Sequence, residues 1–297
     1  MDSYRRFLKP EIVARLSGID IKARLVVEGF LAGLHRSPYH GFSVEFAEYR
    51  QYMPGDEVRR IDWKVYGRTD RYYVKEFEEE TNLKAYILLD ASGSMGYHSN
   101  GISKTEYASY LAASLIYLLI KQQDAAGLLV FDEKIRTFVP PRSIKIHLNT
   151  LLRELDLIKP GGETNLSVVF HELAERIKRR GLIIVISDLF DEPQKILLGL
   201  KHFRHKKHEV IVFHLLDEAE TKFPFTEEVT FRDMETGEEL TVQGAEIRDE
   251  YQKKLQERMK YYKSECREHL IDYFPLTTST PFDKALLAYL GKRSRIG

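Results

Sequence analysis

The chain has 297 residues, of which 43% are hydrophobic and 30% charged, a composition typical of a globular protein. Lysine plus arginine and aspartate plus glutamate number 45 each, so there is no net charge to attract nucleic acid or an anionic membrane surface. The single cysteine, Cys266, excludes an internal disulfide framework and a cysteine-based zinc site.

The apolar segments indicate a protein without a signal peptide or a membrane span. Residues 1–10 lack the apolar core of a signal peptide. The most hydrophobic segment, residues 111–120, is too short to cross a bilayer and instead predicts a buried helix. We therefore expect a cytoplasmic protein.

The first part of the chain is expected to form an extension. Apolar residues recur at helical spacing within residues 1–36, strand-like patterns follow at 42–46 and 71–77, and residues 54–56 form a Pro-Gly-Asp turn. We predict that residues 1–80 are an N-terminal extension packed on a core domain that comprises residues 81–297.

From residue 84 onward, strand and helix patterns alternate. Short apolar runs typical of buried strands occupy residues 86–89, 126–131, 182–188, 210–215 and 271–276, and residues 134–139 could pair antiparallel with 126–131. A capping box at Ser103 and Glu106 predicts a helix that runs to Leu119. Further helices are predicted over residues 147–157, 166–178, 245–268 and 280–291, and a β-hairpin over residues 229–242. This alternation predicts an α/β fold with a doubly wound, mostly parallel sheet flanked by helices.

Three segments of the predicted sheet carry oxygen ligands. Asp90, Ser92 and Ser94 follow the first apolar strand, Thr164 lies in a Gly-Gly-Glu-Thr-Asn loop before a helix, and Asp188 ends another strand. Open α/β sheets bind ligands outside the carboxyl ends of the strands where the strand order reverses, so we expect these residues to meet there. Hydroxyl and carboxylate oxygens suit Mg²⁺ or Mn²⁺.

The Asp-x-Ser-x-Ser sequence, the distant threonine and the strand-end aspartate resemble the metal-ion-dependent adhesion site of von Willebrand factor A domains. The resemblance implies that Ser92, Ser94 and Thr164 contact the metal directly, while Asp90 and Asp188 act through water or hydrogen bonds. It also implies that an acidic side chain of a protein partner completes the coordination.

The segment upstream of this loop narrows the resemblance. Its sequence is Arg50-Gln-Tyr-Met-Pro-Gly-Asp-Glu-Val-Arg-Arg-Ile-Asp-Trp-Lys, followed by Tyr66-Gly-Arg-Thr and Tyr73-Val-Lys-Glu-Phe. These motifs are similar to the signature of a bacterial domain-of-unknown-function family, number 58, over most of residues 40–190. Members carry an A-like domain and are often encoded beside MoxR-type AAA+ ATPases. The resemblance implies an adaptor or substrate-recognition partner of such an ATPase in chaperone-like maturation.

Other uses of the serine loop are open. Asp90 could be the nucleophile of a Mg²⁺-dependent phosphate-ester hydrolase, although Ser92 stands where phosphatases of this kind have a second acid. Serine hydrolysis is disfavoured because no Gly-x-Ser-x-Gly elbow surrounds either serine. A further alternative is a domain that keeps the loop but binds no metal. We favour a non-catalytic interaction module.

Three charged segments have plainer structural interpretations. A polar cluster around the only tryptophan, Trp63, predicts a network that fixes the extension, with a docking surface as the alternative; it comprises Arg59, Arg60, Asp62, Arg68 and Arg71. The basic runs 176–180 and 201–208 predict solvated helix ends rather than a nucleic-acid site. Helix 245–268 is predicted to pack against the sheet.

Overall fold

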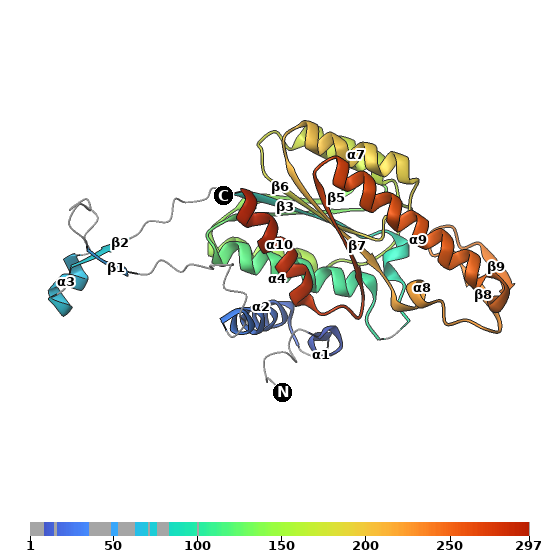
Figure 1. Cartoon of the computed structure of the whole chain (residues 1–297), viewed down its shortest axis with the longest axis horizontal. Coiled ribbons are helices and arrows are strands. Elements are labelled where there is room, and N and C mark those ends of the chain that lie inside the picture. Colours follow the sequence, from blue (N-terminus) through green and yellow to red (C-terminus); the bar gives the residue numbers. More distant parts are fainter. Residues whose placement is uncertain are drawn as a thin grey trace.

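The computed structural model describes residues 9–14, 17–35, 49–52, 63–70, 72–75, 83–99 and 101–296 (Figure 1). Several predicted features lie outside these residues. They are the strand at 42–46, the turn at 54–56, and the residues Arg59, Arg60, Asp62 and Arg71 of the polar cluster.

A six-stranded sheet forms the centre of the described part of the chain. Its strands are β3 (Lys84–Asp90), β4 (Ala125–Phe131), β5 (Ile135–Arg142), β6 (Leu182–Ser187), β7 (Glu209–Leu216) and β10 (Ile271–Thr277). The order is β10-β7-β6-β3-β4-β5; β5 pairs antiparallel with β4, and the other neighbours are parallel. The predicted doubly wound, mostly parallel sheet is confirmed.

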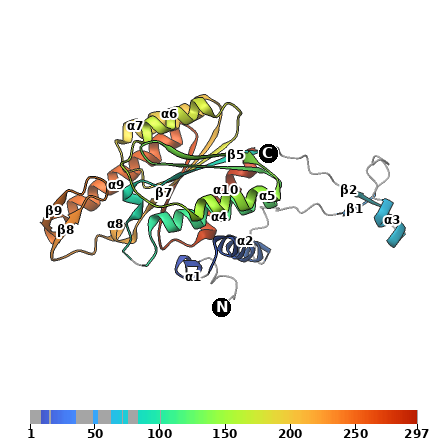
Figure 2. The same cartoon turned by 180° about the vertical axis from the view of Figure 1, so that it is seen from behind.

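Helices cover both faces of this sheet, which explains why its central strands are apolar throughout (Figures 1 and 2). Ile87 and Leu89 of β3 pack in one core, formed with α2 (Ile19–His35), α4 (Lys104–Lys121), α5 (Lys145–Asp156) and α10 (Phe282–Ile296). Tyr86 and Leu88 point to the opposite core, formed with α6 (Leu166–Arg176), α7 (Pro193–His205) and the end of α9 (Gly244–Glu268). The alternation along β3 therefore holds two layers of helices to one sheet.

The elements before β3 form two groups. The short α1 (Pro10–Ala14) precedes α2, which contributes Val26, Val27 and Phe30 to the core around α4. The buried Lys22 of α2 donates a hydrogen bond to the Tyr110 hydroxyl at 2.7 Å. Further along, β1 (Tyr49–Gln51) and β2 (Tyr73–Lys75) form a two-stranded sheet joined through α3 (Trp63–Thr69). The division into an extension and a core domain stays a prediction.

The long helix packs against the sheet at its carboxyl-terminal end, as predicted, but its amino half departs from the prediction. Tyr262 and Cys266, near the end of α9, are buried in the core, but its amino half extends beyond the sheet (Figures 1 and 2). That half lies beside a two-stranded sheet of β8 (Glu228–Arg232) and β9 (Glu239–Gln243), which confirms the predicted hairpin. Between β7 and the hairpin lies the short α8 (Glu218–Lys222).

Two further predictions need correction. The final helix does not end at Gly291 but continues to Ile296. One glycine destabilises a helix by only about 1 kcal/mol. In addition, Lys292 forms ion pairs with Glu209 and Asp272 at 2.7 and 2.9 Å. The run 201–208 is not a uniformly solvated face, because Phe203 and His208 are buried.

The contact between α6 and α7 gives a stability prediction. A Cβ atom on Gly199 of α7 would lie 2.7 Å from the Cβ of Phe170. Overpacking costs about 1–3 kcal/mol, whereas alanine gains about 1 kcal/mol of helix propensity over glycine. We expect Gly199→Ala to lower the free energy of unfolding by roughly 1 kcal/mol in urea denaturation. The matched variant Leu198→Ala, at a side chain 57% exposed, should change it little; equal stability of Gly199→Ala and wild type would contradict this packing.

Candidate metal centre

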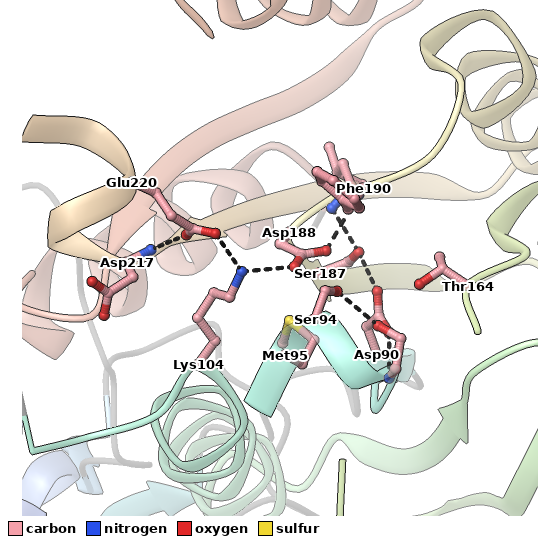
Figure 3. Close-up of polar contacts among 12 residues, drawn as sticks. Asp90, Ser94, Met95, Lys104, Thr164, Ser187, Asp188, Phe190, Asp217 and Glu220 are labelled. Atoms are coloured by element: carbon pink, nitrogen blue, oxygen red, sulfur yellow. Dashed lines mark hydrogen bonds and ion pairs between the residues drawn. The ribbon is translucent and has the colours of Figure 1, made fainter. Parts of the chain in front are cut away.

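The candidate centre lies where the strand order of the sheet reverses. β3 and β6 are neighbours; the chain leaves β3 toward β4 on one side and leaves β6 toward β7 on the other. Asp90 is the last residue of β3, and Asp188 directly follows β6. Two carboxylates therefore meet at the crevice in which open α/β sheets bind their ligands (Figure 3).

Asp90 is held rigidly at the base of this crevice. Its side chain is fully buried, and both carboxylate oxygens accept hydrogen bonds: Oδ1 from the Ser92 amide at 2.9 Å and Oδ2 from the Ser187 hydroxyl at 2.6 Å. Burial and the charge of Asp188 raise the pKa of Asp90 to about 7, against the weaker effect of these hydrogen bonds. A cation nearby would favour its charged form.

The serine hydroxyls lie on the loop after Asp90. This loop forms a short 3₁₀ turn, η3 (Gly93–Gly96), which the Thr105 hydroxyl fixes to α4 by donating to the Met95 carbonyl at 2.9 Å. The hydroxyl oxygens of Ser92 and Ser94 are 3.2 Å apart. The turn thus places two neutral hydroxyl oxygens side by side.

The loop that carries Thr164 lies beside the serine loop. The Gly93 amide donates to the Gly162 carbonyl at 2.9 Å, and the Gly161 amide donates to the Ala91 carbonyl at 3.0 Å. Figure 3 shows Thr164 on the Asp90 side of the crevice. The structure thus brings Asp90, Ser92, Ser94 and Asp188 together and places the Thr164 loop next to them, with α6 starting after Asn165.

Lys104 is a member of this site that the sequence analysis missed. Its side chain is only 1% exposed, and its ammonium group lies 2.8 Å from Asp188 Oδ2 and 2.8 Å from Glu220 Oε1 (Figure 3). Burial alone would lower the pKa of Lys104, but the two carboxylates outweigh it and raise that pKa. A signal was present: Lys104 begins α4, and a helix amino terminus disfavours a positive charge unless acidic groups compensate for it.

The same ion pair sets the charge of Asp188. Burial alone would raise the pKa of Asp188, but the Lys104 charge, its hydrogen bond and a hydrogen bond from Ser94 lower it. Asp188 is therefore ionised and already partly neutralised. Of the predicted site residues, Ser94 and Asp188 line an adjoining cavity.

A second residue that the sequence analysis missed comes from the β8–β9 hairpin. Glu235 accepts hydrogen bonds from the Thr164 amide at 2.9 Å and from the Thr164 hydroxyl at 2.5 Å. The two residues are 71 positions apart, and no local pattern connects them. Beside this contact lies a cavity of about 560 Å³, whose polar end includes Lys104 and Asp188. Its lining also includes the aromatic rings of Phe223, Phe225, Phe231 and Tyr251, together with charged residues of the hairpin such as Arg232 and Glu239.

The chemistry of these ligands fits a hard divalent cation. Within the described residues, no three histidine, cysteine, aspartate or glutamate side chains gather as a metal site. A cation at this crevice would therefore depend on the hydroxyls of Ser92, Ser94 and Thr164. Oxygen ligands of this kind suit Mg²⁺ or Mn²⁺ rather than zinc.

A known protein family matches most of this chain. The family described as "Protein of unknown function DUF58" matches residues 48–261 of the chain. The chain belongs to this family. The matched segment contains all five predicted site residues together with Lys104 and Glu235, and the predicted family is confirmed.

Several proteins are similar to this DUF58 member. The uncharacterized protein Mb1516 of Mycobacterium bovis is 29% identical over 247 residues, which cover 82% of this chain and 77% of that protein. An aerotolerance-related membrane protein from Bacteroides fragilis is 19% identical, covering 71% of this chain and 99% of that one, with a TM-score of 0.46. A von Willebrand factor type A structure from Catenulispora acidiphila is 12% identical over 46% of this chain and 34% of that one, with a TM-score of 0.35.

The comparisons correct the predicted cytoplasmic localisation, since the similar protein from Bacteroides fragilis is described as a membrane protein. The prediction rested on the absence of a signal peptide and of a long apolar run, and neither absence determines where a protein resides. Among the described residues, no helix combines the length and apolarity needed to cross a bilayer.

The buried ion pair of Lys104 gives a prediction for the site. Lys104→Met leaves Asp188 and Glu220 without their cation, and breaking such a buried pair costs about 3–5 kcal/mol. We expect a loss of that order in the free energy of unfolding, measured by urea denaturation.

The matched control is Lys134→Met, which removes an exposed ion pair with Glu133 and should change stability by less than about 1 kcal/mol. If both variants lost the same small amount, Lys104 would not be the compensating charge of this site.

Proposed function

We propose that this chain is a protein–protein interaction module that binds a divalent cation, Mg²⁺ or Mn²⁺, and through it an acidic group of a partner protein. The observation that carries the proposal is the convergence of two buried carboxylates and two serine hydroxyls at the switch point of the sheet, beside the Thr164 loop. In the proposal, Ser92, Ser94 and Thr164 hold the cation directly, and Asp90 and Asp188 orient water or hydroxyl ligands around it.

The charges of the site explain why an acidic partner suits it. The proposed direct ligands are neutral hydroxyls, and the charge of Asp188 is shared with Lys104. A divalent cation held in this way keeps much of its positive charge. An incoming carboxylate would therefore gain a charge-assisted contact at the mouth of the crevice.

The proposal includes no catalysis by this loop. In the alternative, a phosphate-ester hydrolase, Asp90 would attack phosphorus. Both of its oxygens accept hydrogen bonds and its side chain is fully buried, so it is poorly placed for an in-line attack. Ser92 occupies the position in which such enzymes have their second acid.

The proposed partner class is a MoxR-type AAA+ ATPase, with this chain as its adaptor or substrate-recognition component in chaperone-like maturation. Membership of the DUF58 family supports this part of the proposal, through the family resemblance of the motifs in residues 50–77.

A pull-down from native lysate tests the proposal. The expected result is that wild-type protein with Mg²⁺ recovers an AAA+ ATPase, identified by mass spectrometry, and that EDTA abolishes the recovery. The double variant Ser92→Ala/Ser94→Ala should recover none, because it removes two of the hydroxyl ligands.

The matched control is Ser143→Ala, an exposed serine between β5 and α5, which should recover the ATPase like wild type. Equal recovery in every lane, including the EDTA lane, would refute docking through a metal.

A further inference from the structure

The tip of the β8–β9 hairpin lies on the candidate metal centre. Glu235 meets Thr164 with both carboxylate oxygens, one on the backbone amide and one on the hydroxyl. Thr164 is one of the three proposed direct ligands. A carboxylate of this chain therefore already contacts a hydroxyl that is proposed to face the cation.

The hairpin tip also contacts the serine loop. A Cβ atom on Gly93 would lie 2.7 Å from the Met234 carbonyl oxygen and 3.2 Å from Glu235 Cγ. A Cβ atom on Gly96 would lie 3.9 Å from the Met234 methyl group. The tip is thus seated on two of the three segments that carry the predicted ligands, and glycine at position 93 makes this approach possible.

The tip is preformed to present Glu235. Asp233 Oδ1 accepts hydrogen bonds from the Glu235 amide at 2.7 Å and from the Thr236 amide at 3.0 Å. Gly237 adopts a left-handed φ of 76°, and its amide donates to the Asp233 carbonyl at 3.0 Å. These hydrogen bonds hold the backbone of the turn that carries Glu235.

The hairpin is not part of the central sheet. β8 and β9 form a sheet of their own, separate from the central one. A ring cluster at the base of the hairpin joins Phe223 to Phe225, Phe231 and Tyr251, with centroid distances of 5.3, 5.8 and 4.7 Å. The cavity of about 560 Å³ is lined by this cluster as well as by Lys104 and Asp188, and the tip residue Glu235 lines it too.

We propose that Glu235 is an internal substitute for the acidic group of the partner. In the free protein, its carboxylate occupies the position at which the partner's carboxylate would meet the cation, and the hairpin must swing away before the partner binds. This inference rests on the proposed function. Glu235 and the acidic group of the partner both offer a carboxylate. The contact with the Thr164 hydroxyl places the Glu235 carboxylate at the mouth of the site.

A titration of the full chain with Mn²⁺ tests the inference. Electron paramagnetic resonance measures the concentration of free Mn²⁺ at each step. Glu235→Ala should weaken Mn²⁺ binding about tenfold, the lower end of the usual loss when a supporting ligand is removed. Acetate, the smallest carboxylate probe, should strengthen Mn²⁺ binding to Glu235→Ala and leave wild type unchanged. Glu235→Gln keeps the size of the side chain and should weaken binding like the alanine variant.

The matched control is Glu228→Ala, which removes the same charge from an exposed position at the start of β8 and should bind Mn²⁺ like wild type. Unchanged affinity in Glu235→Ala, or an equal effect of acetate on wild type, would overturn this inference and leave the proposed metal site standing. If wild type bound Mn²⁺ no better than Ser92→Ala/Ser94→Ala, both proposals would fail.

Discussion

The hydrogen bond from Ser187 to Asp90 joins the carboxyl ends of β3 and β6, and the arrangement of the site depends on it. It fixes one buried carboxylate at the switch point, and Asp188 places a second directly beside it. Burying two carboxylates is costly unless hydrogen bonds and a cation compensate for them. The residues around Asp90 and Asp188 supply these hydrogen bonds and this positive charge.

In the proposed function, one of the positive charges that balance the two carboxylates is permanent and the other, a bound metal ion, can exchange. Lys104 is a fixed cation that reaches the site from the first turn of α4 and pairs with Asp188 and Glu220. Asp90 instead accepts hydrogen bonds from two neutral donors, the Ser92 amide and the Ser187 hydroxyl. A divalent ion in the crevice would complete the charge balance that Lys104 leaves unfinished, and the partner's carboxylate would complete the ion's coordination.

Features that depend on local sequence could be predicted. The apolar runs ending at Asp90 and Ser187 predict strands buried on both faces, and the capping box of Ser103 and Glu106 starts α4 as expected. The convergence of the Asp90 and Asp188 segments follows from strand order alone. Whether the five predicted residues bind a metal is still a prediction.

Features that depend on tertiary contacts could not be predicted. Glu235 reaches Thr164 from 71 residues away, because α9 carries the hairpin back over the site. The amino half of α9 has a polar sequence that fits either a helix on the sheet or one beyond it. The final helix passes Gly291 because Lys292 finds acidic partners on β7 and β10, which no helix-end pattern reveals.

The central claim is that the crevice at the end of β3 and β6 holds a divalent cation through hydroxyl ligands. The most direct measurement is anomalous diffraction from crystals of the wild-type protein grown with Mn²⁺. We expect an anomalous peak within coordination distance of the Ser92 and Ser94 hydroxyls and of Thr164 or its bridging water. No peak in the crevice, with ordered Mn²⁺ bound elsewhere on the protein, would contradict it.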